Sequence, residues 1–123
     1  MDAALPLQPR TGFVDYDDER MIRTVDAVRE ELEVGGMLFR YRSGDGFGGQ
    51  EGAFVPASFW LAECLGGQGS IDEARAVFER AVSAGNDLGL FSEEYEVRRR
   101  QMLGSFPQGL SHMSHIMAAL AIN

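Results

Sequence analysis

Two adjacent carboxylates are the residues of this chain best suited to chemistry. Glu93 and Glu94 lie in a non-helical stretch between two predicted helices, and Tyr95 follows them at once. A carboxylate held on such a segment can act as a general base, which takes a proton from water as that water attacks a substrate. Adjacent glutamates in a loop are more often solvated surface residues. The pair by itself therefore indicates a candidate site without choosing between the two readings.

A second loop carries another carboxylate. Residues 43–52 contain five glycines and include Glu51. This loop and the loop of Glu93 each precede a predicted buried helix, and long ordered loops at one end of a helical scaffold are typical functional segments. We therefore expect both loops at the same end of the bundle, with Glu51 directed toward Glu93 or Glu94. The glycines lack the strand-to-helix context of a phosphate-binding loop.

Two histidines form a further candidate cluster. His112 and His115 are three residues apart and can share one face of a helix with a metal ion. No third ligand is placed beside them, so the sequence favours a capping or core role for both. It predicts no metal site.

Composition limits the classes of protein. The chain has 123 residues, 45% of them hydrophobic, which is enough for one domain with a core. The net charge of −8 argues against a nucleic-acid partner, because phosphates bind Lys and Arg. Cys64 is the only cysteine, so no intrachain disulfide is expected. There is no pattern of a secretory signal or a membrane span, so we expect a cytoplasmic protein without a membrane partner.

Hydrophobic periodicity predicts an all-α chain of helical hairpins. The predicted helices cover residues 17–32, 53–65, 71–84 and 107–121. The second is apolar on most sides, which is typical of a buried helix, and Trp60 is expected in the core. Residues 1–14, which contain Pro6 and Pro9, are expected to be irregular. Residues 37–42 form a short extended run with Phe39 and Tyr41 on one face.

Local signals fix the ends and faces of the last two helices. Ser70 and Glu73 are predicted to form a capping box, and Pro107 suits the first turn of the fourth helix. The third helix is expected to bury Ala74, Val77, Phe78, Ala81 and Val82. The fourth is expected to place its large apolar side chains in the core: Leu110, Met113, Ile116, Met117 and Leu120.

Several short motifs occur in a specific order along the chain. They are Thr11-Gly12-Phe13-Val14, Asp17-Asp18-Glu19-Arg20, Phe39-Arg40-Tyr41, Gly49-Gln50-Glu51-Gly52-Ala53-Phe54, Ser58-Phe59-Trp60-Leu61, Glu93-Glu94-Tyr95, Phe106-Pro107-Gln108 and Ser111-His112. In this order and spacing they resemble the glucoamylase-type glycoside hydrolases of family 15, some of which cleave trehalose. The resemblance covers almost the whole chain. It implies the C-terminal portion of an (α/α)6 toroid, with residues 1–123 as one partial (α/α)-barrel domain.

The resemblance also implies roles for individual residues. Glu93 would be the catalytic base of an inverting hydrolysis of α-glucosidic bonds in an α-glucan or trehalose. Arg40, Glu51 and Phe54 would line the substrate site, Arg40 as a donor to sugar hydroxyls and Phe54 as an apolar wall. The family uses no metal or organic cofactor. Its general acid lies in an earlier part of the barrel, so the isolated chain is expected to be inactive. We also expect it to self-associate or to pair with the missing barrel portion.

A different class of protein competes with this interpretation. Ala74, Phe78 and Ala81, with Gly69 before them, are similar to the second helix of a tetratricopeptide repeat, which would make the chain a peptide-binding module. No second copy follows at a spacing of about 34 residues, although solenoids need about three repeats. A third possibility is a free-standing helical fragment that covers the exposed faces of another chain.

Overall fold

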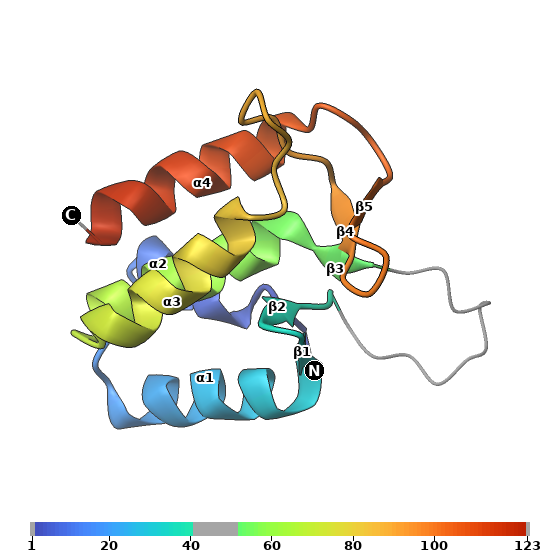
Figure 1. Cartoon of the computed structure of the whole chain (residues 1–123). Coiled ribbons are helices and arrows are strands. Elements are labelled where there is room, and N and C mark those ends of the chain that lie inside the picture. Colours follow the sequence, from blue (N-terminus) through green and yellow to red (C-terminus); the bar gives the residue numbers. More distant parts are fainter. Residues whose placement is uncertain (1, 41–51, 123) are drawn as a thin grey trace.

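The computed structural model describes residues 2–40 and 52–122, and the described chain is mostly helical (Figure 1). Its helices are η1 (Leu5–Thr11), α1 (Glu19–Leu32), α2 (Val55–Gly67), α3 (Ile71–Val82) and α4 (Gly109–Ile122). Its strands are β1 (Glu33–Val34), β2 (Met37–Leu38), β3 (Ala53–Phe54), β4 (Glu94–Glu96) and β5 (Gln101–Leu103). Strands β1 and β2 form a hairpin, and β3, β4 and β5 form an antiparallel sheet in that order.

Helix α2 lies at the centre of the fold. Every residue from Val55 to Leu65 is buried. Helices α3 and α4 both pack extensively on α2, while η1 contacts it from a further side and connects it to α1. Pro56 fits the first turn because its missing N–H would have no partner within the helix there. The prediction of a buried second helix is therefore confirmed, and Trp60 lies in the core as expected.

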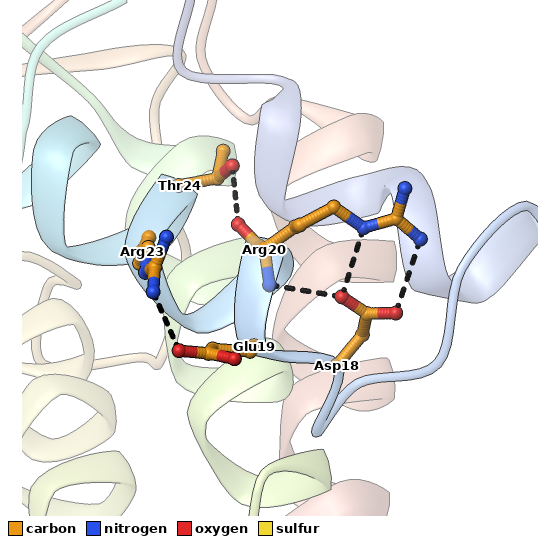
Figure 2. Close-up of polar contacts among 5 residues, drawn as sticks. All are labelled: Asp18, Glu19, Arg20, Arg23 and Thr24. Atoms are coloured by element: carbon orange, nitrogen blue, oxygen red, sulfur yellow. Dashed lines mark hydrogen bonds and ion pairs between the residues drawn. The ribbon is translucent and has the colours of Figure 1, made fainter.

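Helix α1 follows the predicted amphipathic pattern. Its buried face consists of Met21, Val25, Val28 and Leu32. Figure 2 shows the start of the helix, where the Asp18 carboxylate accepts the Arg20 backbone N–H at 2.8 Å and also contacts the Arg20 guanidinium. The Arg23 guanidinium binds Glu19 one turn away. These ion pairs are exposed and contribute little, so the N-cap and the buried face account for this helix.

Two predicted helix starts are corrected by long-range contacts. The second helix begins at Val55 and not at residue 53, because Ala53 and Phe54 pair with Tyr95 and Glu94 as strand β3. The fourth begins at Gly109 and not at Pro107. Its preceding segment is bound elsewhere, since the Gln108 N–H donates to the Phe91 carbonyl.

The capping box is also wrong. Ser70 is the N-cap of α3, but its side chain makes no capping hydrogen bond. Glu73 reaches instead across to α1, where its carboxylate accepts from Arg29 at 2.7 Å. An ion pair between helices has replaced the local one, and the same Arg29 also binds Glu33.

The first 14 residues are more regular than the two prolines suggest. Leu5–Thr11 form a 3-10 helix that includes Pro6 and Pro9, both buried. Arg10 at its end binds the buried Glu63 of α2 through two of its nitrogens. Removing one partner of such a pair leaves the other charge buried without a partner, which destabilises the fold. The pair therefore holds η1 on α2.

Two further expectations are corrected, the all-α fold class and the core face of the fourth helix. The described residues form two small antiparallel sheets, and the extended run at residue 37 forms regular strand only at Met37–Leu38. Its residues 41 and 42 lie outside the described part. The expected core face of α4 is wrong. Its large apolar side chains are exposed, from 38% for Met117 to 66% for Leu120, while Ser111, Ser114 and Ala118 are buried. Val82 of α3 is likewise exposed, whereas Ala74, Val77 and Ala81 are buried as predicted.

The described part of the chain contains no helix with both the length and the apolarity needed to cross a membrane.

The burial of α2 makes a prediction about the single cysteine. Burial, with a smaller effect of the neighbouring Glu63 carboxylate, raises the pKa of the Cys64 thiol to about 12. Because the thiolate is the reactive form, we expect iodoacetamide to label the native chain very slowly at pH 8 and to label the urea-unfolded chain rapidly. Mass spectrometry gives the extent of labelling directly, since Cys64 is the only thiol. Equal rates for native and unfolded chains would contradict the packing described for α2.

Candidate active site

Glu93 lies where three segments of the chain meet. It immediately precedes strand β4. Its N–H donates to the Ser105 carbonyl at 2.9 Å, and its carbonyl accepts the Val55 N–H at 3.0 Å. The backbone of Glu93 is thus tied on one side to the loop before α4 and on the other to the first residue of the central helix. This loop residue is positioned by the rigid scaffold around it.

Glu93 is a half-buried residue, and its carboxylate has close neighbours on two sides. Gly104 adopts a φ of +76°, and a Cβ built on it would lie 2.7 Å from Glu93 Oε1, so a side chain there would collide with the carboxylate. On the other oxygen, the Gln108 side-chain amide approaches Oε2 at 3.4 Å. Ionised glutamate accepts hydrogen bonds only, so the amide nitrogen is the matching partner.

The first turn of α4 holds the segment that leads into Glu93. The Phe91 N–H donates to His112 Nε2 at 3.1 Å, and the Phe91 carbonyl accepts the Gln108 N–H at 2.9 Å. The Ser111 hydroxyl donates to the Ser92 carbonyl at 2.8 Å. A histidine nitrogen can accept a hydrogen bond only while it is unprotonated, so this contact requires neutral His112. The side chains of His112 and Ser111 and the backbone N–H of Gln108 therefore hold Phe91 and Ser92, the two residues that precede Glu93.

Arg40 and Phe54 contact each other and line a pocket. The Arg40 guanidinium carbon lies 5.0 Å from the centre of the Phe54 ring, within cation–π range. The Phe54 ring in turn meets Trp60 edge-on at 5.8 Å. A pocket of about 160 Å³ opens here, lined by Asp2, Ala3, Ala4, Arg40, Phe54, Trp60 and Leu110. It combines an exposed guanidinium with apolar aromatic walls.

Backbone pairing connects this pocket to Glu93. Phe54 is opposite Glu94 in the sheet, and the next residue, Val55, binds the Glu93 carbonyl. On the α4 side, the Leu110 N–H donates to the side-chain oxygen of Gln108, and the side-chain nitrogen of Gln108 donates to the Glu93 carboxylate. The structure thus brings Glu93, Phe54 and Arg40 to one end of the helical layers. Glu51 lies outside the described residues, so its predicted place in this site stays a prediction.

The two histidines have structural surroundings. His112 accepts the Phe91 N–H, as described above. His115 is stacked on Phe78 at 5.4 Å and is tilted against Phe59 and Phe91 at 5.3 and 5.2 Å. Within residues 2–40 and 52–122, no three His, Cys, Asp or Glu side chains come together as a metal site would require. His115 is half-buried, and its neighbours are the aromatic rings of Phe59, Phe78 and Phe91.

Some residues of this site were not predicted as contributors. Trp60 and Leu110 line the pocket, although both were expected only as core residues. Gln108 contacts the Glu93 carboxylate, and Gly104 makes room for it. The Phe-Pro-Gln and Ser-His motifs were visible in the sequence, but motifs alone do not say that these side chains fold back on Glu93.

Comparison with known proteins places the chain in a family. The family model described as glycosyl hydrolases family 15 matches residues 1–120. Trehalase of Thermoplasma acidophilum is 42% identical over 97% of this chain, and trehalase of Mycolicibacterium smegmatis is 39% identical over 99%. A solved wild-type glycosidase superposes with a TM-score of 0.83 over 99% of this chain at 22% identity, a likeness of fold. The chain belongs to glycosyl hydrolase family 15.

The match covers only part of each longer relative. The chain spans 21% of the Thermoplasma trehalase, 19% of the Mycolicibacterium trehalase and 36% of the solved glycosidase chain. It therefore corresponds to about a fifth of the curated relatives.

The aromatic surroundings of His115 predict acid sensitivity. Burial, with a smaller effect of His112, lowers the pKa of His115 below its ordinary 6.5. The native state therefore binds this proton less tightly than the unfolded state does. As the pH falls below about 6.5, the free energy of unfolding should decrease, until His115 is protonated in the native state as well. Urea unfolding between pH 7.5 and 5 should give a shallower pH dependence for His115→Phe than for the unchanged chain. Identical slopes would contradict this.

Proposed function

We propose that this chain carries the general base of an inverting glycoside hydrolase that acts on α-glucosidic bonds, and that Glu93 is that base. The main support is the setting of Glu93. Its backbone is bound on both sides, and its half-buried carboxylate is bounded by Gly104 and Gln108, in a member of a glycoside hydrolase family.

Inverting hydrolysis divides the chemistry between two carboxyl groups. One protonates the oxygen of the leaving group, and the other takes a proton from the water that attacks the opposite face of the sugar. The two groups are roughly 6.5–9.5 Å apart, which leaves room for that water. Glu93 would perform the second step. The acid would come from a part of the family's barrel that this chain does not match.

The substrate class follows from the pocket and the relatives. Arg40 offers fixed guanidinium donors to sugar hydroxyls, and the Phe54 ring offers an apolar face. Glu51 would join them. Two similar proteins are trehalases, so the proposed substrates are trehalose or an α-glucan. The proposed chemistry uses no metal ion or organic cofactor.

The remaining proposals concern architecture and location. We propose that the helices are the C-terminal portion of an (α/α)6 toroid, because the fold superposes on 36% of a glycosidase chain. A cytoplasmic location is supported by the single cysteine. The tetratricopeptide interpretation is not favoured, because the glycoside hydrolase family matches residues 1–120.

The first test concerns activity. The isolated chain should not hydrolyse maltose, maltooligosaccharides or trehalose measurably, because base assistance alone contributes only about 10²–10⁴-fold. Joined to the part of the Thermoplasma acidophilum trehalase that it does not match, it should release glucose from trehalose. Glu93→Gln should then lower kcat at least about 100-fold, since the amide cannot take the water's proton.

Glu94→Gln is the matched control, because it makes the same change one residue away. It should reduce kcat much less. Activity in the joined protein that survives Glu93→Gln would mean that Glu93 is not the base.

The exposed face of α4 supports a proposal about association. We propose that the isolated chain pairs with a second copy of itself through Leu110, Met113, Ile116, Met117 and Leu120. Helix α4 contains no Asp, Glu, Lys or Arg. Two copies, each with a net charge of −8, can therefore meet at this face without like charges that repel each other at the contact. A contiguous apolar surface of this kind usually marks an interaction site.

The test is sedimentation at tens of micromolar. The unchanged chain should sediment as a dimer or larger species, and Met113→Gln with Leu120→Gln should shift it toward monomer. Ile22→Gln, which changes a partly exposed residue of α1, is the control and should not. A monomeric unchanged chain would contradict the proposal.

A further inference from the structure

We infer that Gln108 is the positioning residue of Glu93: it holds the carboxylate in the orientation that a general base needs. The inference rests on the proposed function of Glu93. It adds a residue whose role comes from the contacts around α4.

Gln108 is attached at three atoms. Its backbone N–H donates to the Phe91 carbonyl at 2.9 Å. Its side-chain oxygen accepts the Leu110 N–H at 3.4 Å, and its side-chain nitrogen donates to Glu93 Oε2 at 3.4 Å. One residue therefore connects the segment before Glu93, the first turn of α4 and the carboxylate itself.

The chemistry of the partners fixes the orientation of the Gln108 amide. The Leu110 N–H can only donate, so it requires the amide oxygen. An ionised carboxylate can only accept, so it requires the amide NH2. Turning the amide over would place two donors together at Leu110 and two acceptors together at Glu93. The NH2 group is thus committed to the Glu93 side.

The carboxylate lies between this donor and Gly104. Gly104 leaves the space that Oε1 occupies, since a Cβ there would lie 2.7 Å from it. Gln108 holds Oε2 by a hydrogen bond. A carboxylate has about four lone-pair directions, and this bond occupies one of them. The others keep a constant direction, and one can receive the proton of the attacking water.

The length of the hydrogen bond from Gln108 to Glu93 predicts a larger effect on catalysis than on the stability of the fold. At 3.4 Å it is long for a hydrogen bond and contributes little to the resting fold. Catalytic hydrogen bonds are often long in the free enzyme and shorten in the complex with substrate. Removing the amide should therefore affect the chemical step much more than folding or substrate binding.

The contact can be tested on this chain without any catalysis. In a 15N–1H spectrum, the signal that disappears in Gln108→Ala is assigned to the Gln108 side-chain NH2. One proton of that group should be shifted downfield in the unchanged chain. The shift should be reduced in Glu93→Gln, whose neutral amide oxygen is a weaker acceptor, lost in Glu93→Ala, and kept in Glu94→Gln. A Gln108 signal that does not respond to Glu93→Gln would overturn the inference.

The catalytic consequence is measured in the joined protein described above. Gln108→Ala should lower kcat about 10- to 100-fold, with KM within about twofold, because misplacing a reacting group costs rate and not binding. Gln108→Met fills the same space without a donor and should behave alike, which separates the loss of the donor from a loss of packing. Gln101→Ala, at an exposed position of β5, is the control and should leave kcat unchanged.

The outcomes distinguish this inference from the proposed function. If Glu93→Gln abolishes activity while Gln108→Ala and Gln108→Met behave like Gln101→Ala, Gln108 does not position the base and only this inference is overturned. If Glu93→Gln leaves activity intact, the proposed function fails, and the positioning role fails with it. A fall in kcat for both Gln108 variants, with the spectral shift reduced in Glu93→Gln and lost in Glu93→Ala, would support both.

Discussion

The burial of α2 on every side is the constraint on which the rest of the structure depends. A helix without an exposed face needs a covering element in each direction, and its polar groups need partners inside the protein. Each buried polar group of α2 binds a different covering element: Glu63 binds Arg10 of η1, Ser58 Oγ accepts the Leu38 N–H of β2, and Trp60 Nε1 donates to Ser114 of α4. Every buried side-chain nitrogen and oxygen in the described chain has a partner. The hydrogen bonds that satisfy the buried polar groups of α2 therefore also fix the positions of the neighbouring elements.

This constraint also explains the position of Glu93. The N-terminal end of α2 provides the Val55 N–H for the Glu93 carbonyl, and the bond from Trp60 to Ser114 keeps α4 beside α2. Because α4 is held there, its first turn reaches the segment that precedes Glu93. The candidate base is thus positioned by one buried helix and by a second helix that this helix binds. Its own loop contributes little regular structure beyond the short strand β4.

The sequence predicted those features that depend on local spacing. The apolar stripe of α1 and the all-round apolar character of α2 each identified a helix and its burial. The strands β3, β4 and β5 were missed because they have only two or three residues each, and β3 forms by pairing with residues about 40 positions away, as Phe54 pairs with Glu94. The capping box failed because Glu73 found Arg29 in another helix. The roles of Glu93, Arg40 and Phe54 came from family resemblance, and no local pattern would have indicated the contact from Gln108.

The error at α4 is informative about the fold. Periodicity found its apolar side chains, but it does not say which side of a helix has a neighbour. The side that packs on α2 carries Ser111, Ser114 and Ala118, and such small residues allow two helices to approach closely. The approach is close at the other end as well, where a Cβ on Gly66 would lie 3.2 Å from the Ala121 carbonyl oxygen. Helix α4 thus packs on α2 and α3 through small residues and presents its large apolar residues to solvent. Burial against these neighbours decides the core face of a helix, so an apolar face without a neighbour in the described chain stays exposed, and it is the face through which we propose that the isolated chain associates.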